Sequence, residues 1–235
     1  MVESDVKVVL VPGAWADGSS WSKVVTGLHE NGVGAVTVPV PLTTLDDDVA
    51  ALDRTLERID GPVVLVGHAY AGAVIGAARS PRIKALVYIA ALSPDEGETV
   101  ADVFHRNEPH PTAPKLAPDK HGLIWLPQEA FAAAFAQNAS AQEVAVLAAV
   151  QRPISPACIS VPVGRPLWKE VPSWYLLAEQ DQMIPAETQR FMADRMKARV
   201  SAHPVDHTPS VTAPGFVVDL ILQAVREVRE VREVL

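Results

Sequence analysis

Residues 63–76 read Val63-Val64-Leu65-Val66-Gly67-His68-Ala69-Tyr70-Ala71-Gly72-Ala73-Val74-Ile75-Gly76, and this stretch decides the fold. It opens with an unbroken, mostly β-branched apolar run, a pattern typical of a strand buried on both faces of a parallel sheet. Small residues dominate from Gly67 onward, and they allow a tight turn followed by a helix. We therefore predict a strand, a sharp turn and a helix within these residues.

The turn matches the frame Gly-x-Ser-x-Gly of a nucleophile elbow, in which a serine stands at the tip of a strand-to-helix turn. Gly67 and Ala71 occupy the flanking positions, where helix and strand approach closely and leave little room. The tip itself is Ala69, so the nucleophile position carries no hydroxyl group. Taken alone, the stretch is also compatible with an ordinary strand-to-helix turn of a doubly wound protein.

Strand-like and helix-like segments alternate over most of the chain. Expected strands cover residues 7–11, 33–40, 83–91, 173–178 and 200–205, and expected helices cover residues 21–30, 45–59, 186–197 and 214 to the C-terminus. This alternation predicts an α/β fold with a mostly parallel, doubly wound sheet and helices on both faces. Ligands bind such sheets at the carboxyl ends of the strands, where Gly13 and Ala69 both fall.

The alternation stops between Pro94 and Pro172, a region with many prolines. We expect helices over residues 128–139 and 141–151, and we interpret residues 94–172 as a mainly helical lid inserted into a core of residues 1–93 and 173–235. Aromatic side chains of this region either line a pocket or pack the lid against the core, since both surfaces have the same composition. They are Trp125, Phe131, Phe135 and Trp168.

Two later polar residues directly follow predicted strands. Asp181 precedes a helix, and His207 lies in a turn-forming stretch after the last strand. Because carboxyl ends of parallel strands share one edge, we expect both near Ala69. The alternatives are a carboxylate that only stabilises a helix N-terminus for Asp181 and an ordinary surface residue for His207. Asp95 is a competing acid, since it also follows a strand.

Composition limits the class of protein. The net charge of −8 and the absence of a basic run argue against nucleic-acid binding, and no apolar run is long enough for a membrane span. Cys158 is the only cysteine, so a disulfide or a cysteine-based zinc cluster within the chain is excluded. The acidic residues 1–5 lack a signal-peptide pattern, so we expect a cytoplasmic protein without metal or cofactor. The Val-Arg-Glu repeat at residues 225–234 is a solvated end or a dimer contact, which leaves monomer and homodimer open.

The chain resembles the bacterial α/β-hydrolases that are similar to plant methylesterases and hydroxynitrile lyases, of the methyl salicylate and polyneuridine aldehyde esterase type. The resemblance runs nearly end to end, and its carriers are residues 11–15, 18–21, 67–75, 174–185 and 206–207. It implies an α/β-hydrolase fold, a serine nucleophile at position 69, His207 as general base and Asp181 as the acid that orients it. It also implies an oxyanion hole formed by the backbone N–H groups of Ala14 and Tyr70, and it implies no cofactor.

We further expect Gly13, Trp15, Trp125 and Phe135 to contact the substrate. Two departures from the family pattern affect the site. Pro12 stands where histidine is usual, which leaves the Ala14 amide available. Ala69 stands where serine is expected, so no acyl-enzyme can form.

The interpretation is a serine hydrolase of a small, partly apolar ester, lactone or activated amide, with an inactivating alanine at position 69. Either the chain is a Ser-to-Ala form of an active hydrolase, or the serine was lost naturally. One alternative is a natural, non-catalytic homologue that binds a small ligand. Another is a cofactor-free lyase or oxygenase that uses His207 as a base directly on its substrate.

Overall fold

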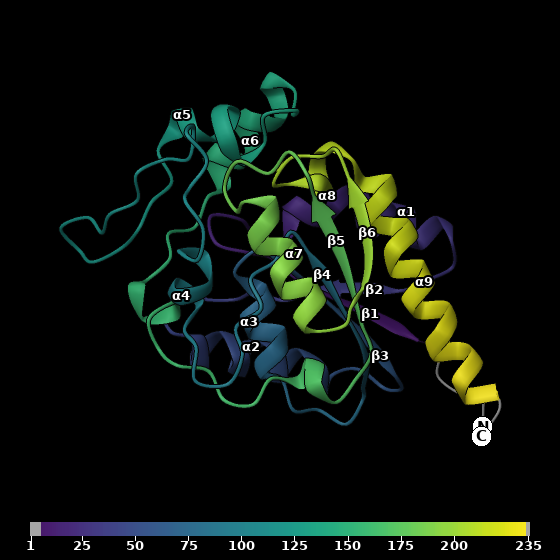
Figure 1. Ribbon diagram of the computed structural model, residues 1–235. Coiled ribbons are helices and arrows are strands. Elements are labelled where there is room, and N and C mark those ends of the chain that lie inside the picture. The colour runs from purple at the N-terminus through teal and green to yellow at the C-terminus, as the bar shows by residue number, and fades with distance from the viewer. Residues whose placement is uncertain (1–5, 234–235) are drawn as a thin grey trace.

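One parallel sheet runs through the molecule, as the computed structural model in Figure 1 shows for residues 6–233. Within these residues its six strands are β1 (Lys7–Val11), β2 (Ala35–Thr37), β3 (Val63–His68), β4 (Ile83–Ile89), β5 (Ser173–Ala178) and β6 (Arg199–His203). Their spatial order is β2-β1-β3-β4-β5-β6, and all neighbouring pairs are parallel. The predicted α/β fold with a mostly parallel, doubly wound sheet is confirmed. The acidic residues 1–5 and residues 234–235 lie outside the described residues.

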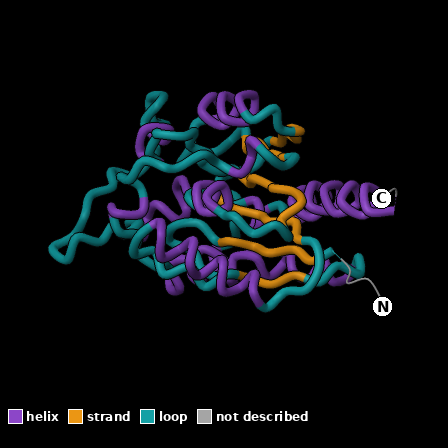
Figure 2. The backbone as a smooth tube through the Cα atoms, turned by 90° about the horizontal axis from the view of Figure 1, so that it is seen from below, coloured by secondary structure: helices purple, strands orange, loops and turns teal. Residues whose placement is uncertain are grey.

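Helices pack on both sides of the strands (Figure 2). They are α1 (Ser22–Glu30), α2 (Leu45–Glu57), α3 (Ala71–Ala77), α4 (Val100–Phe104), α5 (Gln128–Ala130), α6 (Ala141–Val150), α7 (Ala186–Arg195), α8 (Pro209–Thr212) and α9 (Pro214–Glu233). Helices α1 and α9 cover one face of the sheet, and α2, α3 and α7 cover the other.

Strand β3 shows why its sequence is apolar throughout. Val63 and Leu65 pack in the core on the α2–α3 side, whereas Val64 and Val66 pack in the core on the α1–α9 side. All four side chains are fully buried. Because successive side chains of a strand point to opposite faces, only a strand covered on both sides needs such an unbroken run.

Strand β2 is shorter than the predicted strand over residues 33–40. Its pairing with β1 covers Ala35–Thr37, and a last hydrogen bond joins the amide of Val38 to Leu10. Proline cannot donate to a sheet, and prolines stand at positions 39 and 41. The ladder therefore ends at this point, and the chain continues as a loop into α2.

Residues 94–172 connect β4 to β5 through several short elements. Besides α4, α5 and α6 these are a π-helix (Phe131–Phe135) and two 3₁₀ turns (Pro156–Cys158 and Leu167–Lys169). The predicted helix over residues 128–139 is too long, because the backbone leaves the helix at Ala136 (φ −149°). Helix α4 was not predicted, although Thr99 and Asp102 form a capping box at its start.

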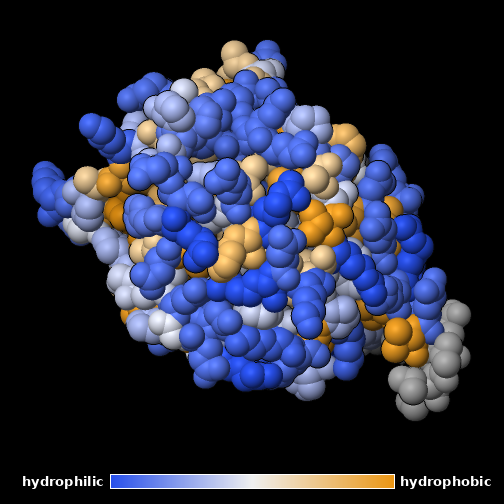
Figure 3. All heavy atoms as spheres, viewed as in Figure 1, coloured by the Kyte–Doolittle hydropathy of each residue, from blue (hydrophilic) through white to orange (hydrophobic). Residues whose placement is uncertain are grey.

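The loop between α4 and α5 projects from the body of the molecule (Figures 1 and 2). The face seen in Figure 3 is predominantly hydrophilic, with apolar side chains scattered over it. Within residues 6–233, every helix is too short or too polar to cross a membrane.

Candidate active site

The turn between β3 and α3 has the backbone of a nucleophile elbow. Ala69 adopts a left-handed conformation with φ of 49°, which costs a non-glycine residue on the order of 1–3 kcal/mol. Hydrogen bonds hold its peptide groups: its N–H donates to Ile89 (3.2 Å), and its carbonyl accepts from Leu92 (2.9 Å). An ordinary turn would not require this strained tip, so the geometry favours an elbow.

Glycines beside the tip are required by space. A Cβ atom on Gly67 would lie 2.8 Å from the carbonyl oxygen of Ala71, and one on Gly72 would lie 2.2 Å from that of Leu92. Both distances are far below a normal contact and involve backbone that cannot swing away. The helix can therefore start this close to the strand only with glycine at these positions.

The loop after β1 packs directly against the elbow. A Cβ atom on Gly13 would lie 2.8 Å from the carbonyl oxygen of His68 and 3.1 Å from the Cβ of Ala69. The next residue, Ala14, is buried, as is Tyr70 on the other side of the tip. Among residues 6–233, no group accepts a hydrogen bond from the backbone N–H of Ala14 or of Tyr70. Two residues at the elbow and in the loop packed against it thus carry unpaired amide donors.

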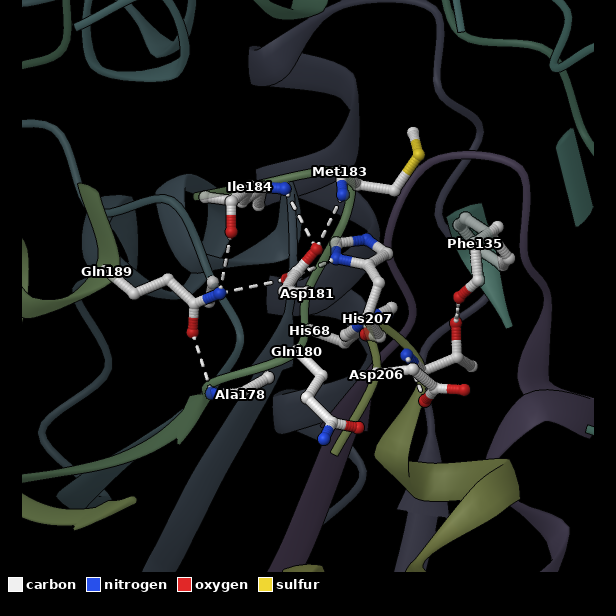
Figure 4. Close-up of polar contacts among 12 residues, drawn as sticks. His68, Phe135, Ala178, Gln180, Asp181, Met183, Ile184, Gln189, Asp206 and His207 are labelled. Carbon is white, nitrogen blue, oxygen red and sulfur yellow. Dashed lines mark hydrogen bonds and ion pairs between the residues drawn. The ribbon is translucent and has the colours of Figure 1, made fainter. Parts of the chain in front are cut away.

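Asp181 and His207 form a buried hydrogen-bonded pair (Figure 4). The imidazole Nδ1 of His207 lies 2.8 Å from Oδ2 of Asp181, and both side chains are at most 2% exposed. Because the carboxylate accepts, Nδ1 carries the proton, and the lone pair lies on Nε2. In the part of the chain that the structure describes, this Nε2 has no hydrogen-bond partner.

Three further donors hold the carboxylate of Asp181. Its Oδ1 accepts from the backbone N–H of Met183 (2.7 Å) and of Ile184 (2.8 Å), at the turn before α7. Its Oδ2 accepts from the side-chain amide of Gln189 on α7 (2.9 Å). With the His207 bond, four donors converge on one carboxylate and leave it little freedom to rotate. Gln189 has no recognisable signal in the sequence.

The loop that carries His207 is held on both sides of the histidine. Asp206 is fully buried and accepts from the backbone N–H of Asn138 (3.0 Å) and from the hydroxyl of Thr212 (2.6 Å). The hydroxyl of Thr208 donates to the carbonyl of Phe135 (2.6 Å). The bonds to Asn138 and Phe135 tie the His207 loop to the end of the π-helix and the residues that follow it.

His68 connects the elbow to the His207 loop. Its Nε2 lies 2.7 Å from the carbonyl oxygen of His207, and the two imidazole rings are 4.8 Å apart. Since a carbonyl can only accept, Nε2 of His68 donates. Burial and the neighbouring His207 lower the pKa of His68 to about 3, so this imidazole is neutral. The elbow, the loop after β1 and the His207 loop therefore meet at one place.

Aromatic rings surround this meeting point. The buried ring of Phe135 lies 5.3 Å from the His207 ring and 6.3 Å from Trp15. Trp15 is held by a bond from its indole N–H to the carbonyl of Ile124 (3.0 Å). Phe131 stacks edge-on against Phe135, whereas Trp168 packs near Arg195.

Two further residues considered from the sequence have other polar partners. Trp125 is 44% exposed, and its indole N–H donates to Asp119 (3.2 Å). Its contact with substrate therefore stays a prediction. Asp95 forms an ion pair with Lys169 (2.5 Å) and not with His207, whose Nδ1 binds Asp181. The competing acid is thus engaged elsewhere.

A cavity of about 410 Å³ lies beside Asp181, and the residues that line it include Gln137, Gln180 and Gln182. The side-chain amide of Gln137 donates to the carbonyl of Gln180 (2.7 Å). Over the described residues 6–233, no group of three or more His, Cys, Asp or Glu side chains is arranged to hold a metal ion.

The fold and this site define a member of the α/β-hydrolase class. The chain belongs to the alpha/beta hydrolase family, whose sequence model matches residues 8–220. The chain is 26% identical over 250 residues to alpha/beta hydrolase nvfD of Aspergillus novofumigatus, covering 95% of this chain and 98% of that protein.

Solved structures share the fold at low sequence identity. Polyneuridine aldehyde esterase superposes with a TM-score of 0.81 at 20% identity, covering 94% of this chain and 99% of that one. A serine-to-alanine variant of a pyrethroid hydrolase gives a TM-score of 0.82 at 20% identity and covers 97% of this chain and 100% of that one. A methylesterase from Arabidopsis gives a TM-score of 0.76 at 17% identity and covers 94% of this chain and 99% of that one. The resemblance noted from the sequence is confirmed at the level of family and fold.

Proposed function

We propose that this chain carries the site of a serine carboxylic-ester hydrolase in which the nucleophile hydroxyl is replaced by the methyl group of Ala69. The observation that carries the proposal is the left-handed backbone of Ala69 (φ 49°) beside two unpaired amides. An alanine gains nothing from this strain, whereas a serine held this way has its Oγ exposed for attack.

Each residue has a role in the proposed reaction of the serine form. Nε2 of His207 takes the proton from Oγ of Ser at position 69 while Oγ attacks the ester carbonyl. The amides of Ala14 and Tyr70 hold the oxyanion, and Asp181 keeps His207 in the required tautomer. His207 then protonates the leaving alcohol. In the second half of the reaction His207 takes a proton from water, which attacks the acyl carbonyl; the bond to Oγ breaks, Oγ regains the proton from His207, and the carboxylic acid is released. This chemistry requires no cofactor.

Small, partly apolar esters fit the proposal best, and a lactone or an activated amide would use the same steps. Phe135 stands next to His207, and Trp15 packs against Phe135, so both rings provide apolar surface. Gly13 brings the loop after β1 against the tip. The printed names of the similar proteins, an esterase, a methylesterase and a pyrethroid hydrolase, lie in the same reaction class.

We also propose that residues 94–172 act as a lid over the site. The support is that Phe135 packs against His207 and that the carbonyl of Phe135 and the amide of Asn138 are held by residues next to His207. Substrate entry would then require the π-helix to move, since Ala69 is only 7% exposed. Monomer and homodimer are equally compatible with this site.

The intact surroundings of Ala69 favour a Ser-to-Ala form of an active hydrolase over a long-standing loss of catalysis. Asp181 retains four donors and His207 retains an unpaired Nε2. A protein that only binds a ligand has no need for such a pair.

The test is to restore the hydroxyl with Ala69→Ser and to measure hydrolysis of p-nitrophenyl acetate and butyrate. We expect activity at least about 10³-fold above the parent chain, because loss of the nucleophile leaves only residual catalysis. Ala69→Gly is the matched control, since it relieves the backbone strain without adding a nucleophile, and it should stay inactive. Turnover by the parent chain equal to that of Ala69→Ser would favour the alternative in which His207 acts directly as a base.

A further inference from the structure

A second buried polar cluster adjoins the elbow through the side chain of Tyr70. Its centre is Asp48, which is fully buried in the first turns of α2, beside α3 (Figure 1). The hydroxyl of Tyr70 donates to Oδ2 of Asp48 (2.7 Å), and the backbone N–H of Leu42 donates to Oδ1 (2.7 Å). The thiol of Cys158 lies 3.8 Å from Oδ2.

Each group in the cluster has one role. Burial raises the pKa of the Cys158 thiol to about 12, and burial together with the Asp48 charge raises the pKa of the Tyr70 phenol well above its usual value. Both groups therefore remain protonated donors. Burial also raises the pKa of Asp48, and the bonds from Tyr70 and Leu42 oppose that rise. The carboxyl is the acceptor that all three donors share.

Tyr70 links this cluster to the chemistry. Its backbone N–H belongs to the peptide group that follows Ala69, and the carbonyl of the same peptide accepts from Leu92 (2.9 Å) and Gly72 (3.1 Å). Leu92 and Gly72 thus fix one end of the peptide plane. The side chain of Tyr70 anchors the other end through its hydrogen bond to the buried carboxyl of Asp48.

We propose that Asp48 is a positioning residue that aims the backbone N–H of Tyr70 at the oxyanion, a role that rests on the proposed esterase function. The Asp48–Tyr70 bond would affect how well the Tyr70 N–H stabilises the oxyanion in the transition state, and not how tightly the substrate binds. Removal of the Tyr70 hydroxyl therefore lowers kcat and leaves KM nearly unchanged, because an interaction made mainly in the transition state is weakened.

The experiment compares two variants that each remove one donor to Asp48, in the Ala69→Ser background. Tyr70→Phe removes the donor attached to the elbow, and Cys158→Ala removes the donor attached to residues 94–172. We expect Tyr70→Phe to lower kcat about 10-fold, less than the 10²–10³-fold loss for deleting an oxyanion donor, with KM within about twofold. Cys158→Ala should leave kcat within about twofold, although it perturbs the same carboxylate.

Concentrations of active sites are counted with a phosphonate ester that labels Ser at position 69, so that unfolded protein does not count as slow enzyme. An equal kcat per site for Tyr70→Phe and its parent would overturn the proposal. So would an equal loss in Cys158→Ala, because it would show a general loss of packing.

A second measurement uses the Ala69 chain and does not depend on hydrolysis. Phenylacetate, a carboxylate that can accept from both amides, is titrated while the backbone N–H signals of Ala14 and residue 70 are followed by NMR. We expect both signals to shift and Tyr70→Phe to weaken binding several-fold, with Cys158→Ala unchanged. If Ala69→Ser proves inactive, the esterase proposal fails while this titration still decides the role of Asp48. No shift at residue 70, or equal affinity in Tyr70→Phe, overturns it.

Discussion

The imidazole of His68 donates a hydrogen bond of 2.7 Å to the carbonyl oxygen of His207, across 139 positions of sequence. One of these residues directly precedes the nucleophile position, and the other is the proposed general base. The bond therefore ties the backbone of the histidine loop to the elbow. His68 is only 1% exposed, so this hydrogen bond lies out of contact with bulk water.

We predict that His68→Leu destabilises the protein by about 1–3 kcal/mol, because the buried carbonyl of His207 loses its donor. The free energy of unfolding is measured by urea titration at pH 7. His29→Leu, on the exposed face of α1, is the control and should change stability by less than about 0.5 kcal/mol. Equal effects of the two substitutions would show that the His68 bond contributes nothing.

His68 also predicts a specific pH dependence. Its pKa is about 3 in the folded protein and about 6.5 when exposed, so between these values the unfolded chain binds the extra proton. The contribution of His68 to the free energy of unfolding is therefore fully present above pH 6.5 and is lost as the pH falls toward 3. Between pH 7 and 4.5 the loss should be roughly 2–3 kcal/mol. His68→Gln should remove that part of the pH dependence. If urea titrations show the same change of unfolding free energy with pH for His68→Gln and the parent chain, His68 is not the group responsible.

Two glycines of α3 provide a matched pair for the elbow. Gly72→Ala places a Cβ 2.2 Å from the carbonyl of Leu92, and it should destabilise by at least about 1–3 kcal/mol, since the backbone must shift. Gly76 lies in the same helix, but a Cβ there would be 3.8 Å from its nearest neighbours, which is an ordinary contact. Gly76→Ala should therefore stabilise the protein by about 0.5–1 kcal/mol. Thermal unfolding of both variants checks this difference, and a similar melting temperature for the two would show that the turn is not tight.

Asp181 should control the tautomer of His207 in the active form. In the Ala69→Ser background, Asp181→Asn keeps the shape of the side chain but permits the wrong tautomer, so kcat should fall by about 10³–10⁴-fold. The ester assay measures this loss, and circular dichroism checks that the fold is retained. An activity within tenfold of Ala69→Ser would mean that Asp181 is only a helix-terminal carboxylate.

The apolar pattern of residues 63–66 was sufficient to predict β3, because only a strand covered on both faces requires it. The pairing of Asp181 with His207 followed from strand order, since the carboxyl ends of parallel strands meet at one edge. That prediction concerned position along the chain and needed no knowledge of side-chain contacts.

Other features depended on partners far away in the sequence. The π-helix ends at Phe135, whose carbonyl accepts from Thr208, 73 positions later, and no local pattern of the alanine-rich segment contains this information. His68 went unrecognised for the same reason, because its partner lies 139 positions away. The roles of Gln189 and Asp48 depend on side-chain contacts with Asp181 and Tyr70 that no sequence pattern marks. Trp125 was expected at the site from its aromatic character alone; its side chain is 44% exposed, and its contact with substrate stays a prediction.

The central claim is that His207 stands ready to activate a hydroxyl at position 69. The most direct measurement is to treat the Ala69→Ser protein with a fluorophosphonate and to locate the added mass by peptide mass spectrometry. We predict stoichiometric labelling of the serine at position 69, none in the parent chain, and a large loss of labelling rate in Ala69→Ser with His207→Ala. Labelling that is absent from Ala69→Ser, or that proceeds equally fast without His207, would contradict the account.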